Sequence, residues 1–352
     1  MKIALFGCSN GLGHVRRIIA ISCQLYRLGF EGELTAYIPK KHILHMKKWH
    51  ECKLFVSNKN IKIVDFCYPK LPKSRTDSIY DKSWDEIDIP ELNKYDVVWS
   101  DNITQIVGVR EDTILTGTFL WYDVFSRNIK SQHIEKYVIE QRDLIRSVKP
   151  IMISNDYFAT PEVRFHTNYQ SVGLYRYDSR LSINNSNTNE LYSDVLFACG
   201  LGGEEEGIMK DALTTIINKY EMMDFTLWVE PRILPEKYPS WIKKANFSSD
   251  MYKQCKAAVI RPGIGTLSDV LANYGRPFIF YNDNYEMNYN ASIISKTGLG
   301  ETCDDPYEAF EKAIDYIYNR KRIINQGTLC AQLRMEGISE TAEFINQRML
   351  LK

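Results

Sequence analysis

Glycine residues cluster at two points where a β-rich run gives way to a helical pattern. The two groups are Gly7, Gly11 and Gly13, and Gly200, Gly202 and Gly203. Glycine permits positive φ angles and lets the backbone come close to a ligand. The free N–H groups at the start of the following helix attract anions, aided by the helix dipole. Both turns are therefore candidate phosphate sites, although tight packing alone also explains glycine at such turns.

A third segment, Ile260 to Gly300, combines glycine with polar residues in a longer pattern. It predicts a strand, a turn, a helix, a short strand, a polar loop and a second helix. Gly263 and Gly265 suit a loop that packs against a flat ligand or a phosphate. Thr266 can cap the helix or donate to diphosphate oxygens. Asp269, one turn further on, can accept hydrogen bonds from ribose hydroxyls.

Short β-rich runs alternate with helical patterns along the chain, which predicts parallel sheets with crossover helices. In the first half a helix is expected from Val15 to Leu28. The strands expected there are Lys2–Phe6, Leu34–Ile38, Ile61–Phe66, Asp96–Ser100, Thr113–Leu115 and Ile151–Ser154.

A second series of the same kind follows an Asn- and Ser-rich run, Leu181–Asn189. It has an expected helix from Glu205 to Lys219 and a last helical segment from Leu329 to Met349. Its expected strands are Asp194–Ala198, Phe225–Val229, Ala257–Ile260 and Pro277–Tyr281.

The predicted fold class is α/β, with two doubly wound Rossmann-like domains facing each other across a cleft. We expect an N-terminal domain over residues 1–172, a linker over 173–192 and a C-terminal domain over 193–330. A terminal helix over 331–352 is expected to pack back on the first domain. In open parallel sheets ligands bind beyond the carboxyl ends of the strands, so two such ends facing each other would enclose one site.

The composition narrows the functional classes. The chain has 352 residues, with 44 basic and 44 acidic side chains, so its net charge argues against broad nucleic-acid binding. Its 8 cysteines form no CxxC pair, and a reducing, cytoplasmic compartment is expected. No apolar run matches a signal peptide or the roughly 20 residues of a membrane span. No carboxylate cluster requires a metal, and none is expected.

The segment from Ile260 to Gly300 resembles GT-B-fold glycosyltransferases. The similar families are the bacterial N-acetylglucosaminyltransferase of peptidoglycan precursor synthesis and the UDP-glycosyltransferase group. The resemblance implies that Gly263, Gly265 and Thr266 lie near the donor's diphosphate and that Asp269 holds the ribose. The two glycine turns add Gly13, Gly202 and Gly203 as further donor-binding candidates. Arg261 suits a contact with phosphate or base, and a structural ion pair is the alternative.

The family then has an acidic or Gln pair that touches the donor sugar, followed two residues later by Asn-Ala. In this sequence Glu286 takes the first position of the pair, and Asn290-Ala291 is present. Met287 replaces the usual Gln, which leaves the identity of the donor sugar open.

The first glycine loop ends in His14, as in the same families, where a histidine at this point is the catalytic base. A histidine with an ordinary pKa of about 6.5 suits that role. Asp101, at the end of a predicted strand, is placed to orient it, with a helix N-cap as the alternative. Asp123 is a second candidate acid. Trp121 is predicted to stack on an acceptor sugar, with core packing as the alternative.

The resemblance implies an inverting, metal-independent transfer of sugar from a nucleotide-sugar co-substrate, a UDP-sugar by default, to a hydroxyl in glycan or cell-envelope synthesis. No cofactor is expected. A basic segment beside apolar residues predicts peripheral contact with the inner membrane face, or else an ordinary solvated helix. Its lysines are Lys40, Lys41, Lys47 and Lys48.

Other functions remain open on the sequence. A sugar-nucleotide hydrolase of the same fold would use water as its acceptor, and an epimerase would act on the same donors. A non-catalytic nucleotide-sugar-binding subunit is a further alternative. A Rossmann dehydrogenase fits poorly, because the glycines at 7, 11 and 13 do not match GxGxxG and no acid follows the second strand at Ile38.

Overall fold

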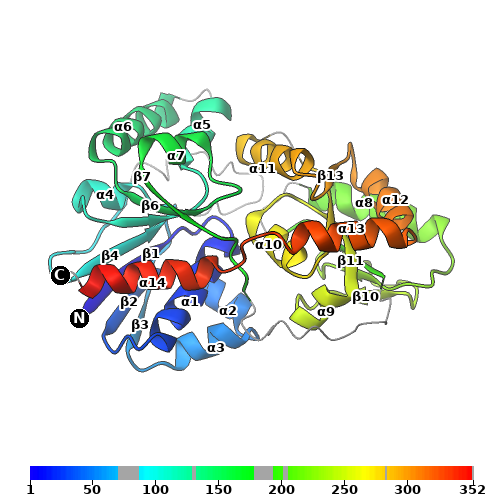
Figure 1. Ribbon diagram of the computed structural model, residues 1–352, viewed down its shortest axis with the longest axis horizontal. Coiled ribbons are helices and arrows are strands. Elements are labelled where there is room, and N and C mark those ends of the chain that lie inside the picture. Colours follow the sequence, from blue (N-terminus) through cyan, green and yellow to red (C-terminus); the bar gives the residue numbers. More distant parts are fainter. Residues whose placement is uncertain (70–86, 129–131, 178–192, 201–204, 282–283, 351–352) are drawn as a thin grey trace. The chain divides into compact units, whose positions relative to one another are not determined.

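A computed structural model describes residues 1–69, 87–128, 132–177, 193–200, 205–281 and 284–350 (Figure 1). The chain divides into two units, residues 1–175 with 336–352, and residues 176–335. Most of the predicted linker, residues 178–192, lies outside the described part, as do Gly202 and Gly203.

The first unit is built on a seven-stranded sheet in the order β3-β2-β1-β4-β5-β6-β7, with every pairing parallel. Its strands are β1 (Lys2–Gly7), β2 (Glu33–Ile38), β3 (Ile61–Asp65), β4 (Val97–Asp101), β5 (Ile114–Thr116), β6 (Ile151–Asn155) and β7 (Asn168–Val172). β1 is buried at every residue after its first, which is typical of a parallel strand covered on both faces.

The helices of this unit include one from the C-terminal part of the chain. They are α1 (Leu12–Arg27), α2 (Lys40–Met46), α3 (His50–Ser57), α4 (Gln105–Val109), α5 (Trp121–Asn128), α6 (Gln132–Val148), α7 (Pro161–His166) and α14 (Gly337–Leu350). Figure 1 shows α14, in red, running beside α1, in blue, and the two helices are in contact. An antiparallel bridge between Tyr175 and Glu336 joins the two segments of chain that belong to this unit.

The second unit has a six-stranded parallel sheet in the order β10-β9-β8-β11-β12-β13. Its strands are β8 (Asp194–Ala198), β9 (Leu227–Val229), β10 (Ile242–Lys244), β11 (Cys255–Ile260), β12 (Arg276–Ile279) and β13 (Glu301–Thr302). Its helices are α8 (Glu206–Lys219), α9 (Ser249–Gln254), α10 (Ile264–Ala272), α11 (Tyr285–Lys296), α12 (Pro306–Ile317) and α13 (Arg320–Cys330). The sheet's core residues pack against α8 and α12.

These two parallel sheets confirm the predicted α/β class, and three local expectations are corrected. The first helix begins at Leu12 instead of Val15, because Gly11 takes a φ of 92° and the helix follows at once. The last helical segment is two helices, and α14 starts only at Gly337. Three strands were not expected, namely β7, β10 and β13, and the last two are too short to show a strand pattern.

The start of α14 depends on a residue without a side chain. A Cβ on Gly337 would lie 2.1 Å from the carbonyl oxygen of Gly173, and the Gly337 N–H donates to Leu174 O at 3.1 Å. We expect Gly337→Ala to lower the free energy of unfolding by about 1–3 kcal/mol, as overpacking does. Urea denaturation measures this loss.

Gly327→Ala is the matched control, since Gly327 lies inside α13 and a Cβ there would meet no heavy atom within 4 Å. Ala at that position should stabilise the helix by up to about 1 kcal/mol. Equal effects of the two substitutions would contradict the close approach described for Gly337.

Candidate active site

The first unit has its topological switch point between β1 and β4. After β1 the chain adds β2 and then β3 on one side of β1, and it later places β4 on the other side. The connections that follow β1 and β4 therefore run in opposite directions along the sheet. Such a point is where ligands bind in open α/β sheets, beyond the carboxyl ends of the strands. β1 ends at Gly7, whose register partner is Asp101, the last residue of β4. His14 follows in the first turn of α1.

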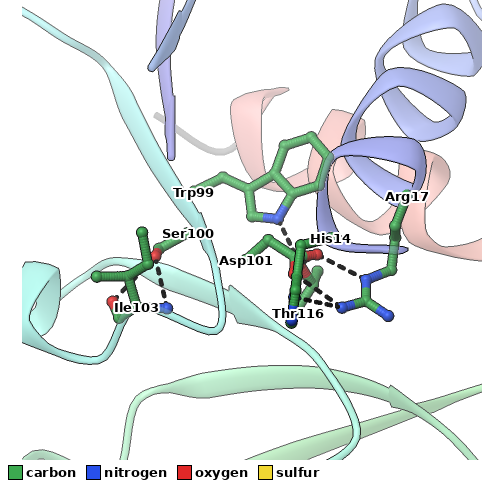
Figure 2. A network of polar contacts seen from close by, with 7 residues as sticks. All are labelled: His14, Arg17, Trp99, Ser100, Asp101, Ile103 and Thr116. Atoms are coloured by element: carbon green, nitrogen blue, oxygen red, sulfur yellow. Dashed lines mark hydrogen bonds and ion pairs between the residues drawn. The ribbon is translucent and has the colours of Figure 1, made fainter. Parts of the chain in front are cut away.

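Figure 2 shows the side chains that meet here, with Asp101 at the centre. His14 Nδ1 lies 2.6 Å from Asp101 Oδ1. Arg17 donates to both carboxylate oxygens, from Nη2 to Oδ1 at 2.8 Å and from Nε to Oδ2 at 2.6 Å. Thr116 donates to Oδ2 at 2.9 Å and accepts from Trp99 Nε1 at 2.9 Å. The carboxylate is therefore held by side chains from α1 and β5.

Asp101 is completely buried, and its charge depends on these partners. Burial alone would raise the pKa of the carboxyl group. The charge of Arg17 and the hydrogen bonds from His14 and Arg17 outweigh it, and the pKa lies below the ordinary value. Asp101 is thus ionised at neutral pH and accepts hydrogen bonds.

The backbone after Asp101 is also constrained. Asn102 has a φ of 61°, a left-handed conformation that is uncommon outside glycine. Ser100 closes this turn, since its hydroxyl donates to Ile103 O at 2.9 Å and accepts from Ile103 N at 3.3 Å. Strained backbone of this kind often accompanies functional sites.

This geometry gives His14 a defined tautomer. Because the Asp101 carboxylate accepts, Nδ1 carries the hydrogen and Nε2 carries the lone pair. A histidine oriented in this way by a carboxylate can act as a general base. The predicted pairing of His14 with Asp101 is present, and Asp101 ends a strand instead of capping a helix, since α4 has Thr104 at its N-cap.

The other two acceptor-side candidates lie in α5. Asp123 accepts from Arg127 Nε at 3.0 Å on the same helix. Trp121 is 4% exposed and packs edge-on against Phe119 with ring centroids 4.8 Å apart. Its ring is also 6.3 Å from that of His14. The structure therefore gives Trp121 the core-packing role beside His14, and an acceptor role remains a prediction.

Removing the Asp101 carboxylate leaves a buried cation without a partner, since the Arg17 side chain is only 7% exposed. We expect Asp101→Ala to lower the free energy of unfolding by about 3–5 kcal/mol. The double variant Asp101→Ala/Arg17→Met removes both charges and should recover most of this loss. Chemical denaturation at pH 7 compares the three proteins, and a double variant no more stable than the single one would contradict the pairing.

The pairing of Asp101 with Arg17 also makes the stability of the protein depend on pH. Because the folded pKa of Asp101 lies below the ordinary value of 3.8, its contribution to stability is present above that value. The contribution is lost as the pH falls further, through the folded pKa. Asp101→Ala should lack this part of the acid unfolding profile.

The second unit has its switch point between β8 and β11, whose carboxyl ends are Ala198 and Ile260. The turn after β8 is occupied by a carboxylate of the same chain. Glu230 Oε2 accepts from Cys199 N at 3.0 Å and from Gly200 N at 2.9 Å, and Arg232 Nε donates to its Oε1 at 2.8 Å. These two N–H groups are therefore bound to Glu230 and are not available to a phosphate.

The turn after β11 is open. α10 begins after Gly263, which is its N-cap, and it has no side-chain capping hydrogen bond. A Cβ on Gly263 or Gly265 would meet no heavy atom within 4 Å, so packing does not require glycine at either position. Thr266 lies in the same first turn and is half-buried. This helix start is the part of the second unit best suited to an anion.

Of three other donor-side candidates, two have a partner within the chain and the third is buried. Arg261 forms an ion pair with Glu205 at 3.1 Å, and its contact with phosphate or base stays a prediction. Asn290, in α11, donates to Pro262 O at 3.0 Å and supports the turn before α10. Asp269 is buried in α10.

Glu286 lies in the first turn of α11, where its N–H donates to Asn284 Oδ1 at 2.9 Å. Met287, the neighbour that departs from the family pattern, is buried.

The basic segment predicted to contact a membrane begins with α2. All of its lysines are exposed, and Leu44 between them is 66% exposed. Within the described residues, no helix is long and apolar enough to cross a membrane. In that same part of the chain no group of acidic, His and Cys side chains is arranged to hold a metal ion.

Sequence reasoning missed Arg17 and Glu230. Arg17 lies three residues after His14, on the face of α1 that also carries Ile18 and Ile21, and a charged residue on a buried face needs a partner. Glu230 directly follows a strand, which places an acid at the carboxyl edge of the sheet.

Two parallel α/β sheets, each with a topological switch point, are the pattern of the GT-B fold. The whole chain aligns with solved structures of this fold. The glycotransferase of kitacinnamycin aligns with a TM-score of 0.68 at 12% identity, covering 99% of this chain and 98% of that one. LpCGTa in complex with UDP aligns with a TM-score of 0.63 at 12% identity, covering 99% of both chains.

UGT89C1 of Arabidopsis thaliana, complexed with quercetin, aligns with a TM-score of 0.61 at 11% identity and covers 99% of both chains. Neither a protein-family model nor the sequence of a curated protein matches this chain. The resemblance inferred from the sequence is thus confirmed at the level of the fold.

Proposed function

We propose that this protein is an inverting glycosyltransferase that moves a sugar from a UDP-sugar to an acceptor hydroxyl. The observation that carries the proposal is His14, held by Asp101 at the switch point of the first sheet. The whole-chain alignment with glycosyltransferases supports it, as does the UDP-bound neighbour.

In this mechanism Nε2 of His14 takes the proton of the acceptor hydroxyl. The hydroxyl oxygen forms a bond to the anomeric carbon while the bond from that carbon to the diphosphate breaks, and UDP leaves. A single displacement of this kind inverts the anomeric carbon. The N–H groups at the start of α10 bind the leaving diphosphate, so the proposed reaction is metal-independent.

The acceptor remains to be identified, and quercetin in one neighbour gives an example of a hydroxyl-bearing acceptor. The exposed lysines at 40, 41, 47 and 48, with Leu44 between them, support a peripheral contact with anionic lipid at the cytoplasmic membrane face. A lipid-linked acceptor in cell-envelope synthesis fits such a contact. A sugar-nucleotide hydrolase, with water in place of the acceptor, is the second candidate because the same His14 base would serve it.

His14→Ala tests the chemistry. We expect it to lower kcat by about 10²- to 10⁴-fold, the usual contribution of a general base, with UDP-sugar binding unchanged. A screen of nucleotide sugars by thermal shift and UDP release, with a cell extract as the source of acceptor, measures both properties. UDP release by the wild type only with acceptor supports the transferase.

Rapid release without acceptor would identify a hydrolase. If no nucleotide sugar raises the melting temperature of the wild type and the wild type turns none over, the proposed function is wrong. Tight binding of a UDP-sugar without turnover under any condition would identify a non-catalytic binding subunit.

Gly265→Val tests the donor site separately. The position has room for a side chain, so the melting temperature should stay close to that of the wild type. The added atoms would occupy the space proposed for the diphosphate, and we expect UDP affinity to fall at least about tenfold, or 1.4 kcal/mol. Isothermal titration with UDP measures the affinity, with Gly327→Ala as the control. Unchanged affinity would remove α10 from the donor site.

A further inference from the structure

Arg17, the buried cation of the first unit's site, contacts an aromatic ring as well as Asp101. Its guanidinium carbon lies over the ring of Tyr175, 5.4 Å from the ring centre. A guanidinium within about 6 Å of the centre of an aromatic ring is attracted by the negative face of that ring. Tyr175 is completely buried and the Arg17 side chain is 7% exposed, so water hardly weakens this contact. Asp101 and Tyr175 therefore both hold the guanidinium.

The position of Arg17 sets the space that is left for His14, as Figure 2 shows. His14 Nδ1 and Arg17 Nη2 both contact Oδ1 of Asp101, at 2.6 Å and 2.8 Å. The two nitrogens are 3.4 Å apart. Because both direct a hydrogen at the same oxygen, a shift of the guanidinium displaces the carboxylate or the imidazole. The direction of Nε2 of His14 therefore depends on where Arg17 is held.

Tyr175 is itself fixed by the C-terminal segment of the first unit. Its backbone forms the antiparallel bridge with Glu336. Two residues before it, the N–H of Gly173 donates to Oε2 of Glu340, in α14, at 2.7 Å. α14 also packs on α1, the helix that carries His14 and Arg17. The position of the ring is thus set by contacts that do not involve the carboxylate or the imidazole of the site.

We propose that Tyr175 is a positioning residue, whose ring holds the Arg17 guanidinium against Asp101 and thereby fixes the direction of His14. This inference rests on the proposed function, in which His14 is the base. Tyr175 acts on the reaction through Arg17 and Asp101. A catalytic group that is misplaced by about 1 Å can lose on the order of 10²-fold in rate. Loss of the ring should therefore slow the transfer and leave the binding of the donor unchanged.

The test separates the aromatic ring from the volume that it fills. Tyr175→Met fills much of the same space without a ring, and Tyr175→Phe keeps the ring and removes only the hydroxyl. Tyr316→Met is the matched control in the second unit, since Tyr316 is also buried and its ring centre lies 5.7 Å from the guanidinium carbon of Arg276. The rate of UDP release is measured at a saturating concentration of the UDP-sugar found in the screen, with a fixed amount of the acceptor extract. Isothermal titration measures the Kd for UDP.

We expect Tyr175→Met to lower the rate of UDP release about 10- to 100-fold, because the imidazole loses its fixed direction. Its Kd for UDP should stay within about twofold of the wild type, because the proposed donor site lies in the other unit. Tyr175→Phe should recover most of the lost rate, and Tyr316→Met should release UDP at about the wild-type rate. If Tyr175→Met does not fold, Tyr175→Leu, which also lacks a ring, replaces it with the same expectation.

A rate for Tyr175→Met within about twofold of the wild type would overturn the inference and leave the proposed function intact. So would an equal loss of rate in Tyr175→Phe, which would assign the effect to the hydroxyl. A parallel loss of UDP affinity, or an equal loss of rate in Tyr316→Met, indicates a general structural effect and also overturns the inference. If the wild type turns over no nucleotide sugar, the proposed function is wrong and this inference is wrong with it.

Discussion

The buried ion pair between Asp101 and Arg17 is the interaction on which the first unit's site depends. A carboxylate without solvent is stable only if its charge is balanced and its oxygens accept hydrogen bonds. Arg17 balances the charge, and Thr116 and His14 complete the contacts. The contacts that stabilise the charge of Asp101 therefore also set the orientation of His14. It follows that the acid and the base have fixed positions before any substrate binds.

Asp101 is shared between two partners, since Arg17 donates to both of its carboxylate oxygens while His14 contacts one of them. The role of Asp101 is then mainly to fix the tautomer and the direction of the His14 ring.

The two glycine turns look alike in sequence but differ in structure. In the first, Gly11 has a positive φ that starts α1 and sets His14 in its first turn. In the second, the N–H groups of Cys199 and Gly200 bind the carboxylate of Glu230. A carboxylate supplied by the chain and a phosphate supplied by a ligand are equivalent partners for such groups. The glycine pattern alone does not distinguish between them.

The sequence predicted the alternation of strands and helices because the buried strands are short, apolar and separated by clear helical patterns. It also predicted that His14 and Asp101 would meet, since both follow strands that a doubly wound order places side by side. It did not predict Arg17 or the partner of Arg261, because an ion pair between distant segments depends on packing that spacing does not encode. The break before α14 was also missed: Gly337, where α14 begins, lies against Gly173, far away in the chain, and sequence spacing does not show such a contact.

The packing of α14 on α1 affects the order in which the two units can finish folding during synthesis. Helix α1 is made early in synthesis, but one of its packing partners is made only after the whole second unit. The second unit is continuous in sequence and can form its own sheet as it emerges from the ribosome. The first unit must meanwhile keep part of the surface of α1 uncovered. Folding of the half that carries His14 and Asp101 is therefore finished last, although its strands are synthesised first.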